Sequence, residues 1–307
     1  MTTDPSALLS RPMLQSDLLE VANEMRAHQL RRLVRDYRDS ALPVMNGGFA
    51  YSNIAEGEEQ MFTCNPYRLW EYTSLFIALK GASEYRRFLD VGGAGSPLPY
   101  FLAEAGFDGT AIDLQPLLVA VCNHVATTRR LPLQAVIGDA TKPLPEFNGR
   151  FDFVTCISVL EHIPASKRAR VFNTIYKALR AGGLFYMTFD YGTYVERDAY
   201  TLENEHREES QSIGDVDEVA NALEACGFRF VGNDPRTLDS SLRGLMSSPA
   251  ARSVTWRYSM NRSAMDAATP WPIVLKYVLK RLLRINRVRD SRFFHHNFFR
   301  IFVEKPR

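Results

Sequence analysis

The chain has 307 residues, which is long for one α/β domain and short for two, so a core domain with extensions is expected. Hydrophobic residues make up 46% of the chain and charged residues 23%, as in ordinary globular proteins, and the formal charge of +2 indicates no particular partner. The four cysteines are far apart, which argues against a disulfide framework and a zinc motif.

Targeting and membrane signals are not evident in the sequence. The first residues, MTTDPSALLSRP, lack the basic and apolar regions of a secretory signal. No apolar run reaches the length of about 18 residues that a transmembrane helix needs. We therefore expect a cytoplasmic protein.

Residues 1–84 are predicted to form an N-terminal helical extension. Apolar positions at helical spacing predict a helix over 13–41, and the glycines of 44–64 indicate a loop. Asn65-Pro66 then opens a second helix that runs to about Lys80. The start of this helix carries side chains suited to an aromatic or polar substrate, although packing on the core explains the aromatic ones equally well. These are Tyr67, Arg68, Trp70 and Tyr72.

Residues 85–234 are predicted to form the core domain, in which short β-runs alternate with helical stretches. Repeated units of this kind indicate an α/β fold with a parallel sheet and helices on both faces. Ligands of such sheets bind at the carboxyl ends of the strands. The predicted strands are 87–91, 110–114, 133–137, 151–157, 184–189 and 228–231. An insertion over 235–292 follows, and residues 293–307 contain the final strand, Phe298–Val303.

Residues 88–97, FLDVGGAGSP, are the most informative segment. An apolar strand contains Asp90, which can accept hydrogen bonds from a ligand ammonium. A turn follows, and Ser96 is a suitable N-cap for a helix that Pro97 begins. Glycines permit a tight turn and close approach of a ligand to the backbone. They are Gly92, Gly93 and Gly95. Leu98 stands at the third glycine of the dinucleotide-binding pattern, which argues against that class.

Two further acids follow the next two strands. Asp113 ends the second strand, where its carboxylate could accept hydrogen bonds from ribose hydroxyls. Asp139 follows the third strand, where its carboxylate could accept one from an adenine amino group.

The succession LDVGGAGS, AIDL, GDA, FDFVTCISVLEHIP and LRAGGLFYMTFD resembles class I S-adenosylmethionine (SAM)-dependent methyltransferases. The resemblance covers about residues 85–232 and the last strand. It implies a Rossmann-like, seven-stranded, mostly parallel sheet with an antiparallel last strand. It also implies SAM as the cofactor and S-adenosylhomocysteine as the product.

The resemblance assigns roles to individual residues. Asp90 and Gly92 would border the amino-acid part of SAM, Asp113 its ribose, and Asp139 with Ala140 its adenine. Ile157 or Ser158 would line the methyl-transfer face. The predicted cofactor site comprises Asp90, Gly92, Gly93, Gly95, Asp113, Leu114, Asp139, Ala140, Ile157 and Ser158. The chain departs from the family at Ala94 and Ser96, where glycine is usual.

Methyl transfer to a hydroxyl group also requires removal of a proton from the acceptor. The predicted catalytic residues are His162, Asp190 and Tyr191, and His206 is a further candidate base. The alternative for His162 is a structural turn that caps the next helix. This segment also resembles ubiquinone-pathway O-methyltransferases, in which two acids and a histidine gather a divalent ion. Ser158 stands in place of the first acid, so no metal site is predicted.

Charge is unevenly distributed toward the end of the chain. Residues 196–218 hold nine acidic and two basic residues, which is typical of a solvated loop; a substrate lid is the alternative. Residues 273–307 hold ten basic and two acidic residues, and 271–284 have the pattern of a basic amphipathic helix. Packing on the domain with the basic ends in solvent is the favoured interpretation of 271–292. Contact with an anionic membrane or with RNA are the alternatives.

The sequence therefore predicts a SAM-dependent methyltransferase that acts on a small-molecule acceptor, at oxygen or nitrogen. An RNA methyltransferase is the first alternative, and the near-neutral charge and the acidic stretch argue against a nucleic acid partner. A non-catalytic SAM-binding scaffold protein is the second. The pattern does not assign an oligomeric state.

Overall fold

A computed structural model describes part of the chain. The described residues are 10–12, 66–79, 84–191, 195–196, 210–211, 216–238 and 297–307. The predicted helix over 13–41, the loop over 44–64, His206 and the basic segment 271–292 lie outside them. Among the described helices, none is both long and apolar enough to cross a bilayer.

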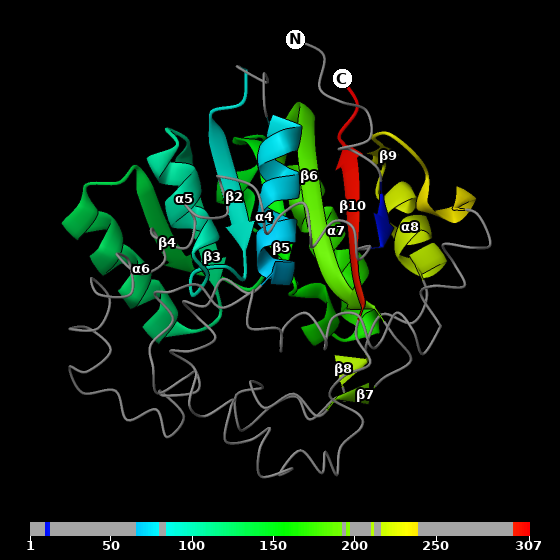
Figure 1. The fold of residues 1–307 in the computed structure, drawn as a ribbon, viewed down its shortest axis with the longest axis horizontal. Helices are drawn as coiled ribbons and strands as arrows, with labels where there is room; N and C mark the ends of the chain where they lie inside the picture. Colours follow the sequence, from blue (N-terminus) through cyan, green and yellow to red (C-terminus); the bar gives the residue numbers. More distant parts are fainter. Residues whose placement is uncertain are drawn as a thin grey trace.

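One twisted sheet forms the centre of the described structure (Figure 1). Its strands follow the order β1-β10-β6-β5-β2-β3-β4, with β9 also paired to β10. Strands β2 to β6 are parallel, and β10 runs antiparallel to β6. The long strands are β2 (Arg87–Val91), β3 (Asp108–Asp113), β4 (Leu133–Ile137), β5 (Phe151–Ile157), β6 (Leu179–Tyr191) and β10 (Asn297–Glu304). The short ones are β1 (Arg11–Pro12) and β9 (Arg229–Phe230).

The predicted Rossmann-like arrangement is confirmed, with one addition. Seven strands correspond to the predicted ones, and the antiparallel last strand is β10. The described sheet has an eighth strand, β1, which pairs with β10 at Arg11↔Arg300 and Pro12↔Phe299. A two-residue strand has no periodicity that could be recognised in the sequence. The strands β7 (Val195–Glu196) and β8 (Ser210–Gln211) form a separate antiparallel pair.

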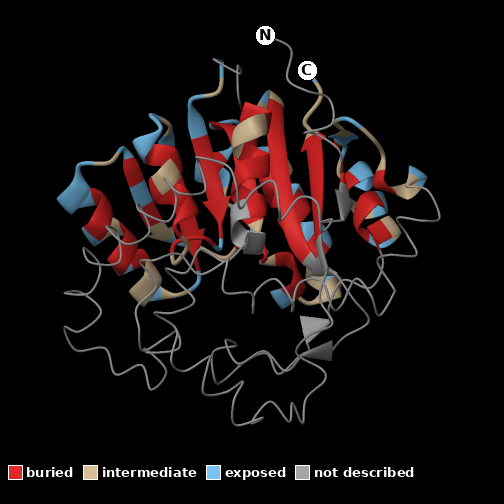
Figure 2. Ribbon diagram, in the orientation of Figure 1, coloured by how far each residue is buried: buried red, intermediate tan, exposed pale blue. Residues whose placement is uncertain are grey.

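Helices cover both faces of the sheet, as expected. One hydrophobic cluster joins a face of the sheet to α4 (Pro66–Leu79), α5 (Leu98–Glu104) and α6 (Pro116–Arg129). A second cluster joins the other face to α7 (Ala165–Ala178) and α8 (Val216–Ala225). Neighbouring strand residues alternate between the two clusters, because successive side chains of a strand point to opposite faces. Figure 2 shows the resulting buried strands between the two helical layers.

The helix after the glycine-rich turn differs from its prediction. It begins at Leu98, one residue later than expected, and spans only 7 residues. Pro97 is its N-cap and makes no side-chain capping bond. Ser96 is therefore not the N-cap, although its hydroxyl accepts a 3.4 Å hydrogen bond from the Leu98 amide.

Groups outside the strands bond part of the outer sides of β4 and β10. At β4, the side-chain amide of Asn123 on α6 bonds the amide and the carbonyl of Ala135, at 2.8 and 2.9 Å. At β10, the Ser10 hydroxyl accepts a 3.3 Å bond from the amide of Phe302, and Val231 donates to the carbonyl of Phe302 at 3.0 Å. Such pairing removes exposed strand edges, which otherwise promote aggregation.

The amino end of β5 is fixed by Asp152. Its carboxylate accepts hydrogen bonds from the backbone amides of Arg86 and Arg87, at 2.8 and 2.7 Å. It also forms a 2.5 Å ion pair with Arg180, near the start of β6. This buried side chain thereby joins β2, β5 and β6 at the end of the sheet opposite the predicted site.

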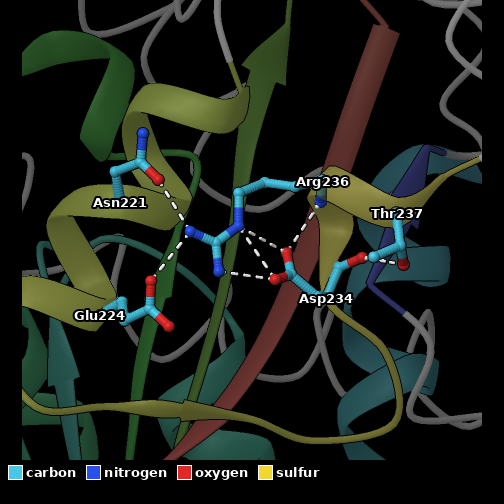
Figure 3. Close-up of polar contacts among 5 residues, drawn as sticks. All are labelled: Asn221, Glu224, Asp234, Arg236 and Thr237. Atoms are coloured by element: carbon cyan, nitrogen blue, oxygen red, sulfur yellow. Dashed lines mark hydrogen bonds and ion pairs between the residues drawn. The ribbon is translucent and has the colours of Figure 1, made fainter.

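Residues after β9 fold back on α8 (Figure 3). Arg236 in the short helix η4 (Pro235–Thr237) forms ion pairs with Glu224 on α8 and with Asp234, and a 2.8 Å bond to Asn221. Asp234 in turn accepts a bond from the Arg236 amide at 2.9 Å. The first residues of the predicted insertion thus contact the core.

Candidate functional site

The predicted cofactor residues gather at the carboxyl ends of the parallel strands. Asp90 on β2 lies in register with Ala111 on β3 and Thr155 on β5. Asp113, the last residue of β3, pairs with Ile137, the last residue of β4. Because these strands are parallel neighbours, residues remote in sequence meet at one edge of the sheet.

Asp90 is the most unusual of these residues, because its carboxyl group is buried and only partly bonded. The side chain is 1% exposed. Thr155 Oγ1 donates a 2.6 Å hydrogen bond to Oδ1, whereas Oδ2 is buried without a hydrogen-bond partner. Burial raises the pKa of Asp90 to about 7; the bond from Thr155 opposes this and the charge of Asp113 adds to it. An acceptor atom buried without a partner is costly, so Oδ2 fits a donor or cation supplied by a ligand.

The glycine-rich turn adapts to this carboxyl group. A Cβ atom on Gly93 would lie 1.8 Å from Asp90 Oδ2, so only glycine fits there. Gly92 has φ +73°, and a Cβ on it would also meet Val159 at 2.8 Å. The Ser96 amide closes the turn by a 2.8 Å bond to the carbonyl of Gly93. Ala94, where the family usually has glycine, is fully buried in the core cluster.

Asp113 connects the end of β3 to the glycine-rich turn. Its side chain is buried and accepts a 3.0 Å bond from the Gln115 amide. Burial raises the pKa of Asp113, and backbone bonds from Gln115, Ala94 and Leu114 oppose the rise. The carboxylate therefore helps to order the glycine-rich turn at the carboxyl end of β3.

Asp139 is engaged by its own loop. Thr141 donates to it from both the amide and the hydroxyl, at 2.9 and 2.6 Å, and Lys142 lies 3.5 Å away. Burial opposes these groups, yet together they lower the pKa of Asp139. The neighbouring Ala140 is buried. The predicted adenine contact of both residues stays a prediction.

Two large apolar side chains are exposed beside these acids. Leu114 is 55% exposed and Ile137 is 64% exposed, at the ends of adjacent strands β3 and β4. Leu114 was among the predicted cofactor residues, whereas Ile137 was not. The position of Ile137 at the end of a predicted strand, directly before Gly138, is the signal by which the sequence could have indicated a ligand contact.

Ser158 follows Ile157 at the carboxyl end of β5 and has an unusual backbone. It is a residue other than glycine with φ +49°, and it is buried. Its hydroxyl donates a 2.9 Å bond to Oε1 of Glu71 on α4, and its amide donates a 3.0 Å bond to the carbonyl of Thr188. The sequence analysis missed Glu71, because a single acid in an apolar helix indicates no partner.

The predicted catalytic residues lie at the ends of β5 and β6. His162 is exposed in the short helix η3 (Leu160–His162), directly after the loop at Ser158. Arg168 of α7 holds this loop through bonds to the carbonyls of Leu160 and Ile163, at 3.3 and 3.0 Å.

Asp190 and Tyr191 end β6, and only their backbone is described; it pairs with Phe298 and Asn297 of β10. Among the described residues, no group of three acids, histidines or cysteines could hold a metal ion.

Two of the proposed substrate-contacting aromatic residues belong to the core instead. Trp70 and Tyr72 are 2% and 1% exposed and pack in the first hydrophobic cluster. Their burial agrees with the alternative of packing on the core, because the apolar face of α4 covers the sheet. The side chains of Tyr67 and Arg68 lie outside the described part.

Comparison with known proteins supports the class that this geometry indicates. Residues 89–187 match the family model described as "Methyltransferase domain". This segment is a class I SAM-dependent methyltransferase domain, as the sequence predicted. The ubiquinone biosynthesis O-methyltransferase of Xanthomonas campestris pv. campestris strain B100 is 32% identical over 135 residues, 44% of this chain and 54% of the relative. The protein of the same name from Xanthomonas oryzae pv. oryzae strain PXO99A has equal identity and coverage. The chain thus spans about half the length of the curated relatives it matches.

Solved structures also resemble the chain. The phosphoethanolamine N-methyltransferase 2 of Haemonchus contortus, with phosphomonomethylethanolamine and S-adenosylhomocysteine, has a TM-score of 0.49 and 17% identity, covering 82% of this chain and 56% of that one. The cyclase SpnF has a TM-score of 0.47 and 19% identity, covering 79% of this chain and 84% of that one.

Proposed function

We propose that this protein transfers a methyl group from SAM to a hydroxyl group of a small-molecule acceptor. The observation that carries the SAM-binding part is the buried carboxyl group of Asp90, whose Oδ2 has no partner and faces Gly93. The ammonium group of SAM is a donor with the charge that this oxygen requires. The hydroxyl acceptor is supported by the relatives, which are named O-methyltransferases.

The strand ends offer a set of groups that fits the rest of the cofactor. The backbone of the glycine-rich turn can lie close to it, and the Asp113 carboxylate can accept from ribose hydroxyls. The exposed side chains of Leu114 and Ile137 can cover the apolar faces of an adenine ring. When bound, SAM supplies an electrophilic methyl group on a sulfonium.

The remaining requirement is a group that removes the acceptor proton. His162 is the proposed general base, because an imidazole titrates near neutral pH and this one is exposed beside the end of β5. Asp190 and Tyr191 are proposed acceptor contacts at the end of β6.

Calorimetry with SAM, S-adenosylhomocysteine and NAD tests the cofactor. We expect binding of the first two and none of NAD; tight NAD binding without SAM binding would contradict the proposal. Acceptor chemistry is then tested by measuring S-adenosylhomocysteine release with a panel of small phenols, aliphatic alcohols, amines and short RNAs. Turnover confined to amines or to RNA would contradict hydroxyl methylation.

With an acceptor in hand, H162N tests the base. We expect kcat/KM to fall by about 10²- to 10⁴-fold while SAM affinity stays unchanged. Unchanged turnover would identify His162 as part of a structural turn.

A further inference from the structure

Glu71 is a carboxylate placed unexpectedly within the core. It lies on α4, outside the segment that matches the methyltransferase domain, and is 0% exposed. Its Oε1 accepts hydrogen bonds from Ser158 Oγ at 2.9 Å and from Thr188 Oγ1 at 2.5 Å. One carboxylate oxygen thereby joins α4 to the neighbouring strands β5 and β6. A buried carboxylate is expensive to desolvate, so its retention in an apolar helix requires a reason beyond packing.

Ser158, the partner that directly follows β5, holds a conformation that residues other than glycine seldom adopt. Its φ of +49° lies in the left-handed region, directly after the last residue of β5. Such a conformation persists where surrounding groups fix it, and it is often found at functional sites. Here the amide is held by the Thr188 carbonyl and the hydroxyl by Glu71. The strained turn determines where the chain goes next, toward Val159 and the loop of His162.

Val159 connects this turn to the cofactor residues. A Cβ on Gly92 would lie 2.8 Å from Val159 Cγ2, so the loop after β5 packs directly on the glycine-rich turn after β2. A shift of the Ser158 backbone would therefore move the wall of the predicted cofactor site.

Ser74, a neighbour of Glu71 on α4, anchors the helix to β10. Ser74 accepts a 2.6 Å bond from Arg300 of β10 and donates a 2.6 Å bond to the carbonyl of Trp70. Ser74 thus docks α4 on β10, whereas Glu71 bonds Ser158 at the end of β5. Variants of these two residues can therefore distinguish docking of the helix from positioning of the chain after β5.

From these contacts we propose that Glu71 is a positioning residue. It holds Ser158 in its left-handed conformation and so fixes the loop after β5 against the glycine-rich turn. The consequence for ligand binding rests on the proposed function, since it concerns the cofactor of the methyltransferase. The backbone effect does not depend on it.

A double-mutant cycle tests this role by means of glycine, which adopts positive φ without help. In the full-length protein, we expect E71A and S158A each to weaken S-adenosylhomocysteine binding by about tenfold in calorimetry. S158G should bind S-adenosylhomocysteine more tightly than S158A does, and adding E71A to S158G should cost much less affinity than adding it to the wild type. This rescue separates positioning from a merely structural role, which would make E71A equally harmful in both backgrounds.

S74A is the matched control on the same helix. It should lower the melting temperature and leave the affinity for S-adenosylhomocysteine within about twofold of the wild type. Circular dichroism checks that each variant is folded, and E71Q, which keeps the shape of the side chain, replaces E71A if that variant does not fold.

Hydrogen exchange of the ligand-free protein gives a second readout. E71A should speed exchange in a peptide over 157–163 by about tenfold, and S158G should restore slow exchange in the E71A background. If the wild type binds no S-adenosylhomocysteine, the proposed function fails and exchange alone decides the role of Glu71. Unchanged exchange in E71A, an S158G variant as impaired as S158A, or an S74A variant that loses affinity as E71A does would each overturn the positioning role.

Discussion

Protonation of the Asp90 carboxyl group should make both the stability of the fold and the ligand affinity of the site depend on pH. Its pKa of about 7 lies above the ordinary value of 3.8, because burial disfavours the ionised form. The folded protein therefore binds this proton more tightly than the unfolded chain does. Below about pH 4 the protonated carboxyl group contributes its full stabilisation to the fold. That stabilisation, about 4 kcal/mol, is lost as the pH rises from about 4 to about 7.

Cofactor binding should show the opposite dependence on pH. An ammonium group at Oδ2 favours the ionised form, so binding below pH 7 must first release the proton. We expect the affinity for S-adenosylhomocysteine to fall by up to about tenfold per unit as the pH drops from 7 to 6, and to level off above 7. D90N should bind weakly and lose this dependence in calorimetry. The same pH profile in D90N would assign the titration to another group.

Asp113 should contribute both affinity and order. D113A is expected to weaken SAM binding by about 1–3 kcal/mol, the scale of lost hydrogen bonds to a charged group. A small loss of stability should accompany it, because the carboxylate also bonds the backbone of the glycine-rich turn. D108A, at the exposed start of the same strand, is the control in calorimetry and thermal melts. Reduced stability with unchanged affinity would make Asp113 a purely structural residue.

Individual residues were predictable where a backbone motif fixes their surroundings. Asp90, Asp113 and the glycines lie in or directly after strands that the sequence reveals, and they meet at one edge as expected. Glu71 was not predictable, because its hydroxyl partners lie 87 and 117 positions away in sequence. The left-handed Ser158 was likewise hidden, since serine carries no preference for positive φ.

At the level of elements, Asp152 joins three strands through a single carboxylate. D152A should lower the free energy of unfolding by about 2–4 kcal/mol in urea denaturation, because the Arg86 and Arg87 amides and Arg180 lose their acceptor. S-adenosylhomocysteine affinity should not change, since Asp152 lies at the opposite strand ends. E84A removes an exposed acid nearby and should cost less than about 0.5 kcal/mol.

The same carboxylate predicts a loss of stability in acid. Burial raises the pKa of Asp152, but bonds from the Arg87 amide, Arg180 and the Arg86 amide outweigh burial and hold it below its usual value. The stabilisation is present above the unfolded pKa of about 4 and is lost as the pH falls below it. D152A should therefore lose less stability between pH 5 and pH 3 than the wild type. Parallel pH profiles of the two proteins would contradict this ion pair.

Element types were predicted better than element ends, for physical reasons. Strands buried on both faces are continuous apolar runs, and the parallel strands here were recognised as such. β6 extends beyond its predicted 184–189 at both ends, because Leu179 pairs with Phe151 of β5 and Tyr191 pairs with Asn297 of β10. β1 depends entirely on long-range pairing with β10, with Ser10 held by the Asn233 side chain, and sequence periodicity carries no such information.

At the scale of the whole molecule, the last strand enters the sheet at the edge that carries the candidate site. β10 begins at Asn297, which pairs with Tyr191 at the carboxyl end of β6, so the chain after residues 271–292 joins the sheet at the edge of the site. The fold class followed from the alternation of β-runs and helices. The helices predicted over 13–41 and 271–284 lie outside the described residues and stay predictions.

The last prediction concerns residues 271–292, which lie outside the described part of the chain. We expect the apolar positions of this basic segment to pack on the protein, so that the purified chain does not sediment with anionic vesicles even at low salt. Membrane docking would instead give sedimentation that weakens with ionic strength, since each basic residue near an anionic surface contributes about 1 kcal/mol over a Debye length. Charge reversal by K280E, R281E and R284E should then abolish it and leave SAM binding intact. K142E, R150E and K177E make the same change of charge at exposed positions elsewhere and serve as the matched control. Salt-sensitive sedimentation lost only in the first triple variant would replace the packing interpretation with a membrane-binding one.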